Sequence, residues 1–281
     1  MSIVSLDHIV LVVADLGRAS AEFSSLGFTV TPGGKHKDIG THNALIGFAD
    51  GSYLELIAFT SVSSTPEVTE ATVPPAFVRV GEWKKRGPGL VDFALLPSNI
   101  SADMTFSGAR GLALSGPLLG GRVRPDGVQV FWQFGFPDAF DVPFLCADVT
   151  PRSHRVPLGR AVEHTNGSLG ISRVTVAVKD LVKSSSRYAA LLALDATESP
   201  LALSSKAPTP ETRAVQFVVA GTRLILAAPD GPGSPLHDIL LQRGEGPCAL
   251  ELRGGRDGVF TAARTQGARI ELTADRSDSS F

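Results

Sequence analysis

The stretch Leu6–Gly27, LDHIVLVVADLGRASAEFSSLG, holds the pattern that decides the fold. It begins with mostly β-branched residues and leucine, which favour a strand, and the alternation of side chains turns His8 inward. Asp15 then suits the N-cap of a helix whose apolar residues recur at helical spacing, and Gly27 suits its end. The stretch therefore predicts a strand followed by an amphipathic helix.

Three further strands are predicted after this helix. A short strand at Phe28–Thr31 is expected to end at Pro32–Gly34, and the polar segment Lys35–Asn43 is expected to form a loop. The hairpin signal Asp50-Gly51 predicts two antiparallel strands within Ala44–Phe59. The predicted order is strand, helix, strand, strand, strand.

The same pattern recurs along the chain. Val91–Leu95 repeats the composition of Asp7–Leu11, and a helix is predicted at Ile100–Arg110. A third copy begins at Ile171, and a fourth begins near Cys248. Repeated units of this kind predict an α+β fold in which βαβββ modules pair into cupped mixed β-sheets.

The fourth copy is expected to be incomplete. A helix is predicted near Val259–Gln266 and a strand at Arg269–Leu272, but the tail that follows is too short and too polar for the remaining strands. With 281 residues, two domains are expected. They are an N-terminal domain of two modules at 1–152 with the expected active site, a linker at 153–169, and a degenerate C-terminal domain at 170–281.

Composition excludes several classes of partner. The chain has 26 Lys and Arg against 28 Asp and Glu, so neither nucleic acid nor an anionic membrane is an expected partner. No apolar run is long enough for a transmembrane helix. Cys146 and Cys248 lie far apart in apolar company, as buried thiols of a reducing compartment do. A cytoplasmic protein is expected.

Several motifs of the first module together resemble one known family. They are DHIVLVVADL from Asp7, G-F-x-V from Gly27, G-G-x-H from Gly33, G-T-x-N from Gly40 and YLELI from Tyr53. This pattern resembles the glyoxalase-like branch of the vicinal oxygen chelate superfamily, which also includes bleomycin resistance proteins and extradiol dioxygenases. The resemblance covers Leu6–Phe59 best and weakens in the later modules.

The resemblance implies a cup formed by two modules around one divalent metal, with ligands from the first and last strands. It also implies chemistry on neighbouring oxygens of a small substrate: isomerisation, ring cleavage, epoxide opening or epimerisation. Some members of the superfamily have no metal and only bind small molecules.

His8 and Glu55 match the ligand positions of the first module. Imidazole nitrogen and carboxylate oxygen suit Zn, Fe, Mn or Ni, so the pair does not choose the metal. The alternative for His8 is a hydrogen-bonded histidine in a half-buried strand. Glu55, flanked by apolar residues, must pair, become protonated or bind a metal if it is inside.

The second module departs from the family pattern. Alignment places Asp92 opposite His8 and Cys146 near the position of Glu55. Asp92 is a candidate third ligand or substrate-binding residue, and the alternative is a turn cap. Cys146 would be an unusual ligand for this chemistry. Whether a metal binds at all therefore stays open.

Further candidates for substrate contact come from the polar segment and from aromatic residues. His36 is predicted to act as acid or base, with Thr41 and Asn43 over the mouth of the cup, unless these residues only brace a surface loop. Tyr53 and Trp132 are candidate substrate-binding residues. Trp132 would suit an aromatic or polyketide-like substrate, and the alternative is core packing.

The C-terminal half lacks both ligand types, with Arg173 in place of His8 and Ile225 in place of Glu55. A structural or dimerising role is expected there, which makes the chain a candidate homodimer.

The leading hypothesis for the whole protein is a metal-dependent lyase, isomerase or dioxygenase that stabilises an enolate-type intermediate. A metal-free protein that binds a small molecule or templates its rearrangement is the alternative. A structural dimer partner without any ligand is a third hypothesis.

Overall fold

The computed structural model describes residues 3–36, 39–60, 75–199, 202–204, 206 and 208–274. The elements of the first half are β1 (Ile3–Val12), α1 (Leu16–Ser25), β2 (Thr31–His36), β3 (Thr41–Gly47), β4 (Tyr53–Phe59), α2 (Pro75–Arg86), β5 (Gly89–Pro97), α3 (Ile100–Ala109), β6 (Leu114–Val123), β7 (Gln129–Pro137) and β8 (Phe144–Asp148). Those of the second half are α4 (Arg152–Arg155), the 3-10 helix η2 (Gly159–Val162), β9 (Ser168–Ala177), α5 (Leu181–Leu192), β10 (Thr197–Glu198), β11 (Thr212–Val219), β12 (Thr222–Pro229), α6 (Leu236–Arg243), β13 (Gly246–Gly254), β14 (Gly258–Phe260), the 3-10 helix η3 (Ala262–Arg264) and β15 (Arg269–Ala274).

The first two modules close into a barrel with the strand order β1-β4-β3-β2-β6-β7-β8-β5. The modules meet where β1 pairs antiparallel with β5 and where β2 pairs with β6. Closure gives every strand two neighbours and leaves the inward side chains around one central space. The predicted α+β class with paired βαβββ modules is confirmed.

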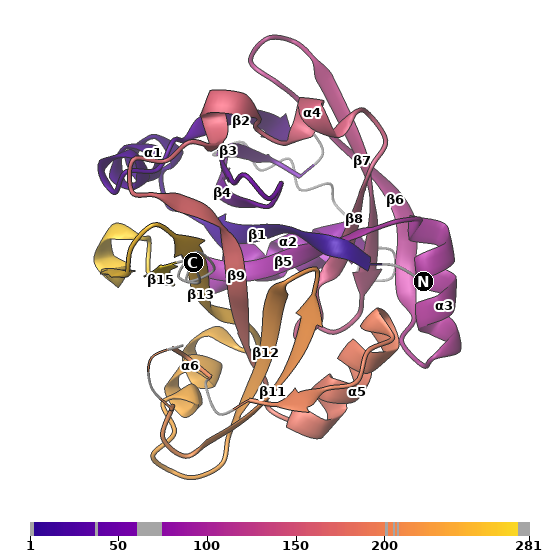
Figure 1. Cartoon of the computed structure of the whole chain (residues 1–281). Coiled ribbons are helices and arrows are strands. Elements are labelled where there is room, and N and C mark those ends of the chain that lie inside the picture. The colour runs from indigo at the N-terminus through magenta and orange to yellow at the C-terminus, as the bar shows by residue number, and fades with distance from the viewer. Residues whose placement is uncertain are drawn as a thin grey trace, which may run out of the picture.

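The second half forms an open seven-stranded sheet of order β10-β11-β12-β9-β13-β15-β14. The third module is complete, and the fourth is incomplete, as predicted (Figure 1). The helix predicted at 259–266 is wrong, because Val259 and Phe260 pair with β15 as strand β14 and only the short η3 follows. These two β-favouring residues gain ladder hydrogen bonds that a helix at this position would forfeit.

The local signals around the first helix are confirmed. Asp15 accepts a hydrogen bond from the backbone nitrogen of Arg18 at 2.7 Å, and α1 starts at the next residue. Gly27 has a φ of 87°, a left-handed value that glycine adopts without strain and that ends the helix.

The loop predicted at Lys35–Asn43 is wrong. Strand β2 runs through Pro32–Gly34 as far as His36, with a shift of register against β3 at this point. The shift accommodates the proline, and a Cβ on Gly33 would lie only 2.1 Å from Oδ1 of Asn43. His36, Thr41 and Asn43 are therefore buried strand residues of the barrel, not residues of a loop over its mouth.

The two halves pack against each other through β5 and β13, and one apolar cluster contains residues of both. Arginines also connect them: Arg86 donates to the backbone oxygen of Glu245 at 2.7 Å, and Arg110 donates to that of Ala190 at 2.7 Å. The predicted linker 153–169 includes most of α4, all of η2 and the start of β9. The domain boundaries themselves stay a prediction.

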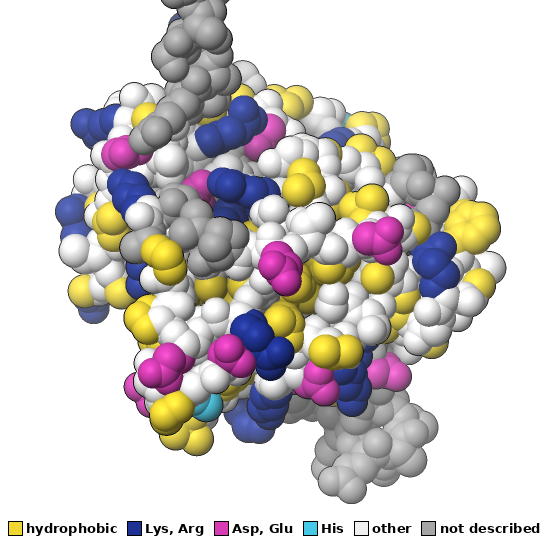
Figure 2. Space-filling model, turned by 60° about the horizontal axis from the view of Figure 1, so that its bottom comes forward, with side chains coloured by type: hydrophobic (Ala, Val, Ile, Leu, Met, Phe, Trp, Pro, Cys, Tyr) yellow, Lys and Arg dark blue, Asp and Glu magenta, His cyan; other side chains and the backbone are white. Residues whose placement is uncertain are grey.

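The surface is of mixed charge on the face shown in Figure 2, where basic and acidic side chains alternate over short distances. None of the helices among the described residues is both long and apolar enough to cross a membrane.

Candidate active site

The barrel surrounds a cavity of about 130 Å³ that is partly open to solvent. Most of its wall is apolar, and α2 contributes Phe77 and Trp83 to it. The titratable and polar side chains that line it are His8, His36, Asn43, Tyr53, Glu55, Arg122, Trp132, Cys146 and Arg155. An enclosed apolar space with a few convergent polar groups is the usual form of a small-molecule site.

His8 and Glu55 come together on neighbouring strands. β1 and β4 are parallel, with His8 paired to Tyr53 and Val10 paired to Glu55. The Nε2 atom of His8 lies 3.6 Å from Oε2 of Glu55, and the two residues are 3% and 8% exposed. Adjacent strands thus place an imidazole and a carboxylate at one point of the cavity wall.

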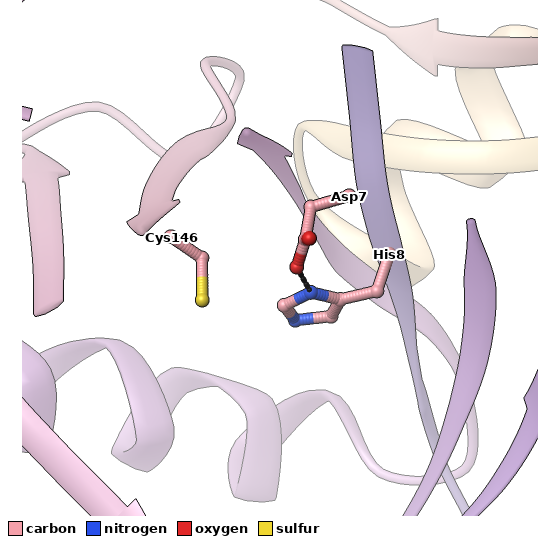
Figure 3. Close-up of side chains that lie close together, drawn as sticks. All are labelled: Asp7, His8 and Cys146. Carbon is pink, nitrogen blue, oxygen red and sulfur yellow. Dashed lines mark hydrogen bonds and ion pairs between the residues drawn. The ribbon is translucent and has the colours of Figure 1, made fainter. Parts of the chain in front are cut away.

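Asp7 orients His8 from the opposite side of the ring. Its Oδ2 lies 2.6 Å from Nδ1 of His8 (Figure 3), as the close-up shows. The imidazole ring stacks on the ring of Tyr53, with 4.8 Å between the two ring centroids. Because Nδ1 is bonded to Asp7, Nε2 is the ring nitrogen that faces Glu55. In proteins, a histidine that binds a metal through one ring nitrogen commonly bonds to a carboxylate through the other, which orients the ring. Asp7 and His8 have this arrangement at the cavity wall.

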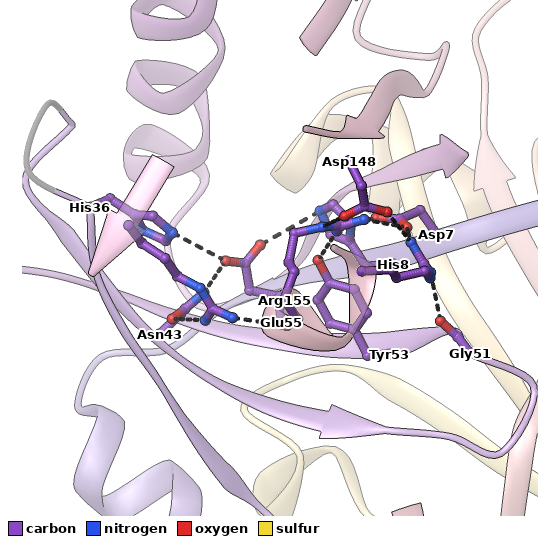
Figure 4. A network of polar contacts seen from close by, with 11 residues as sticks. Asp7, His8, His36, Asn43, Gly51, Tyr53, Glu55, Asp148 and Arg155 are labelled. Carbon is purple, nitrogen blue, oxygen red and sulfur yellow. Dashed lines mark hydrogen bonds and ion pairs between the residues drawn. The ribbon is translucent and has the colours of Figure 1, made fainter. Parts of the chain in front are cut away.

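Asp7 is itself held by two arginines of α4, of which Arg155 lies in the predicted linker and Arg152 directly before it. Arg155 donates to both of its oxygens at 2.7 and 2.9 Å, and Arg152 donates to Oδ1 at 2.6 Å. Arg155 also donates to the hydroxyl of Tyr53 at 2.7 Å and pairs with Asp148 (Figure 4). Burial would raise the pKa of Asp7, but Arg155 and His8 outweigh it and hold that pKa well below its ordinary value.

The other oxygen of Glu55 faces His36 and Asn43 (Figure 4). Nε2 of His36 lies 3.9 Å from Oε1 of Glu55, and Asn43 donates to that oxygen at 2.6 Å. Burial lowers the pKa of His36 to about 4, so its ring is neutral at pH 7. Burial would raise the pKa of Glu55, but His8, His36 and the bond from Asn43 lower it overall.

Thr41 contacts His36 rather than the cavity. Its hydroxyl lies 2.9 Å from Nδ1 of His36, which orients that ring as Asp7 orients His8. Glu55 therefore lies between two oriented imidazole rings, one from β1 and one from β2.

Two sets of side chains are candidates for metal binding. Among the described residues, Asp7, His8 and Cys146 form the one set of three whose ligand atoms all lie within 4.8 Å of one another (Figure 3). Both oxygens of Asp7 are already engaged by arginines, and burial raises the pKa of Cys146 well above its ordinary value. His8 and Glu55, with His36 beside them, are the more available donors.

The second module carries no carboxylate at the matching positions. Ala94, not Asp92, lies opposite His8, and Ala94 pairs with Phe144 in the parallel arrangement that His8 has with Tyr53. By this register Cys146 matches Glu55, as the sequence alignment indicated.

Asp92 lies outside the cavity lining. Its carboxylate accepts from Arg79 and, at 2.8 Å, from the indole nitrogen of Trp83, both on α2. It thereby fastens the helix that contributes to the cavity wall. The alignment had placed this residue two positions away from where the register has it.

Sequence reasoning missed Asp7, Arg122 and Arg155. Strict alternation along a strand directs Asp7 away from His8, but β1 has a register irregularity against β5 between Leu6 and His8. Arg155 lies in a segment without periodicity. Arg122 lies on a glycine-rich strand, β6, that the sequence did not predict.

A sequence profile of the glyoxalase-like domain family matches residues 6–192. The chain belongs to the glyoxalase-like domain family. The match covers the whole barrel and the start of the second sheet, and the resemblance to the vicinal oxygen chelate superfamily is confirmed. The search of curated proteins found no sequence that matches this glyoxalase-like protein.

Solved structures share its fold over the full length. A hypothetical protein from Staphylococcus aureus superposes with a TM-score of 0.70 at 18% identity, over 96% of this chain and 99% of that one. A mutant of 4-hydroxymandelate synthase from Streptomyces coelicolor superposes with a TM-score of 0.62 at 13% identity, over 100% and 95% of the two chains. Such low identities establish the fold alone.

Proposed function

We propose that this glyoxalase-like protein is a metal-dependent enzyme that acts on a small oxygenated substrate inside the barrel. The observation that carries the proposal is the pair His8 and Glu55, buried 3.6 Å apart at the wall of an apolar cavity. Buried carboxylates need a compensating partner, and Glu55 has no arginine or lysine within 4 Å among the described residues.

The donor chemistry fits a divalent cation. Glu55 is ionised at pH 7 because its pKa is lowered, and His36 is neutral because its pKa is about 4. His8, with Asp7 on Nδ1, offers Nε2. One carboxylate and one imidazole suit Zn, Fe, Mn or Ni, and His36 stays free beside them. His8 and Glu55 would hold the ion, and it would supply Lewis-acid polarisation of neighbouring substrate oxygens.

The chain's own groups would then position the substrate and move the proton. His36 is neutral, lies in the cavity wall and is oriented by Thr41, so its Nε2 can accept a proton from a substrate carbon or hydroxyl. Asn43 fixes the carboxylate of Glu55 through its amide. The apolar wall with Trp83 and Phe144 excludes water from a developing enolate-type anion.

Elemental analysis of protein purified without chelator tests the proposal. We expect a stoichiometric divalent metal in the wild type and its loss in His8→Ala and Glu55→Ala. His237→Ala is the matched control, because that histidine is exposed in the second half and bonds only to a backbone oxygen. A wild-type chain without metal, whose ligand binding is unchanged by EDTA, would instead support the metal-free alternative.

A further inference from the structure

Arg122 is a buried cation without a carboxylate partner in the part of the chain that the structure describes. Its side chain lines the cavity and the residue is 5% exposed. It donates to Oδ1 of Asn43 at 3.0 Å and to the backbone oxygen of Arg155 at 2.9 Å, and both acceptors are uncharged. The nearby carboxylate of Glu55 reaches Arg122 only through Asn43, so an anion in direct contact with the buried guanidinium would stabilise it further.

Trp132 supplies a second buried donor beside the same cavity. Neither its Nε1 nor the Nε of Arg122 has a hydrogen-bond partner among the described residues. Gly120 pairs with Trp132 across β6 and β7, so Arg122, two residues further, is a diagonal neighbour on the same face. Buried N–H groups without acceptors are rare in folded proteins, and a ligand is one way to satisfy them.

The backbone leaves room for both donors. A Cβ on Gly120 would lie 2.5 Å from Nε1 of Trp132, and a Cβ on Gly33 would lie 2.4 Å from Nη1 of Arg122. Strands β6 and β2 thus carry glycine at the positions that these two side chains cover. The glycines let both side chains lie against the strand backbone, in positions that a larger residue would block.

The other acidic groups near the cavity are paired with arginines. Asp7 and Asp148 are neutralised by Arg152 and Arg155. Glu55 and Arg122 remain as the charged groups at the cavity, and Asn43 bonds to both of them. Of these two groups, Arg122 is the one that attracts an anion.

We propose that Arg122 and Trp132 form an anion subsite that binds a carboxylate of the substrate, so that the substrate is a small organic anion with an apolar body. A carboxylate has two oxygens, which could accept one hydrogen bond from each of the two unpartnered N–H groups. The inference rests on the proposed function only in taking this cavity as the substrate site.

Nuclear magnetic resonance of the indole N–H groups tests the subsite, because the chain has only two tryptophans and both line the cavity. Trp132→Phe assigns the signal. The probes are phenylacetate and its neutral analogue phenylacetamide, titrated into EDTA-treated protein. We expect phenylacetate to bind about tenfold more tightly and to shift the Trp132 signal, since a charged hydrogen bond contributes about 1.5–3 kcal/mol.

Substitutions of Arg122 separate the effect of its charge on binding from an effect on folding. Arg122→Gln should abolish the preference for phenylacetate, and Arg122→Lys should retain part of it. Arg124→Gln is the control, because Arg124 does not line the cavity and pairs with Asp126. Should Arg122→Gln fail to fold, Trp132→Phe should weaken phenylacetate binding and leave phenylacetamide binding unchanged.

Equal binding of the two probes to the wild type overturns the inference, and so does a carboxylate preference that persists in Arg122→Gln. Because the titrations are made in EDTA, the result is independent of metal. A metal-free protein with the preference intact would contradict the proposed function and retain the subsite. A protein that binds metal but shows no preference for phenylacetate would support the proposed function and contradict the subsite.

Discussion

The barrel and the open sheet of the second half use the same module with different inward residues. In the barrel His8 pairs with Tyr53, and in the open sheet Arg173 pairs with Arg223 in the same parallel register. Glu251 lies opposite Arg173, where the barrel has Ala94 opposite His8. The module therefore supplies a scaffold, and a few inward positions decide whether it carries donors for a ligand.

The inward charges of the open sheet compensate one another. Arg173 and Arg223 pair with Glu251 at 3.7 and 3.2 Å, and all but Arg223 are buried. Ala202, buried, covers this face and accepts a hydrogen bond from Thr175 at 2.7 Å. In the barrel, by contrast, Glu55 and Arg122 face a cavity. The difference teaches that closure of the sheet and charged groups that face a cavity instead of one another, not the module, distinguish the candidate site.

The largest expected effect is the loss of Arg155. Arg155→Met leaves Asp7 and Asp148 with fewer compensating bonds in the barrel wall, and breaking a buried ion pair costs about 3–5 kcal/mol. Urea unfolding measures the change. Arg213→Met, which breaks an exposed pair with Asp230, should cost less than about 1 kcal/mol. Equal losses of stability in the two variants would show that the buried network of the barrel stabilises the protein no more than an exposed ion pair does.

The pH dependence of stability should show a contribution from His36. Its pKa falls from 6.5 to about 4 on folding, so the unfolded chain binds the proton more readily. This contribution is fully present above pH 6.5 and is lost as the pH falls to about 4, and it amounts to about 3 kcal/mol. His36→Gln should flatten the profile over this range. A profile that is unchanged by the substitution would contradict the neutral, buried imidazole.

A smaller effect is expected from Arg173 in the open sheet. Arg173→Met leaves Glu251 with Arg223 and a hydrogen bond from Ser172, so a loss of about 1–2 kcal/mol is expected. Urea unfolding gives the value, and elemental analysis of the same sample should give an unchanged metal content. A loss of metal from this variant would show that the two halves share one site.

Much of the fold could be predicted from local signals. The helix after His8 starts at its predicted cap, Asp15, and a second helix follows Asn99 in the same way. Helix α2 and strand β6 were not predicted. In β6, Gly120 and Gly121 interrupt the sequence pattern of a strand, because glycine has a low strand propensity. The strand forms nevertheless, because it pairs with β7.

The candidate site could be predicted only in part, and the roles of its residues stay predictions. His8 and Glu55 could be singled out because each is a polar residue within an apolar strand, and such residues are rarely buried without a compensating partner. His36 and Asn43 were selected as polar residues but assigned to a loop. Asp92 was selected by alignment, and an error of two residues in the register placed it beside His8.

By itself the sequence determined the repeated module, its helix caps and the histidine and glutamate that the later modules lack. Only the tertiary structure decided that the modules close into a barrel and that Arg155 orients the histidine through Asp7. It also decided that Arg122 faces the cavity and that none of the described carboxylates contacts it directly. The physical reason is range: caps and periodicity act between neighbouring residues, whereas registers, bulges and buried charge pairs join residues far apart in the chain.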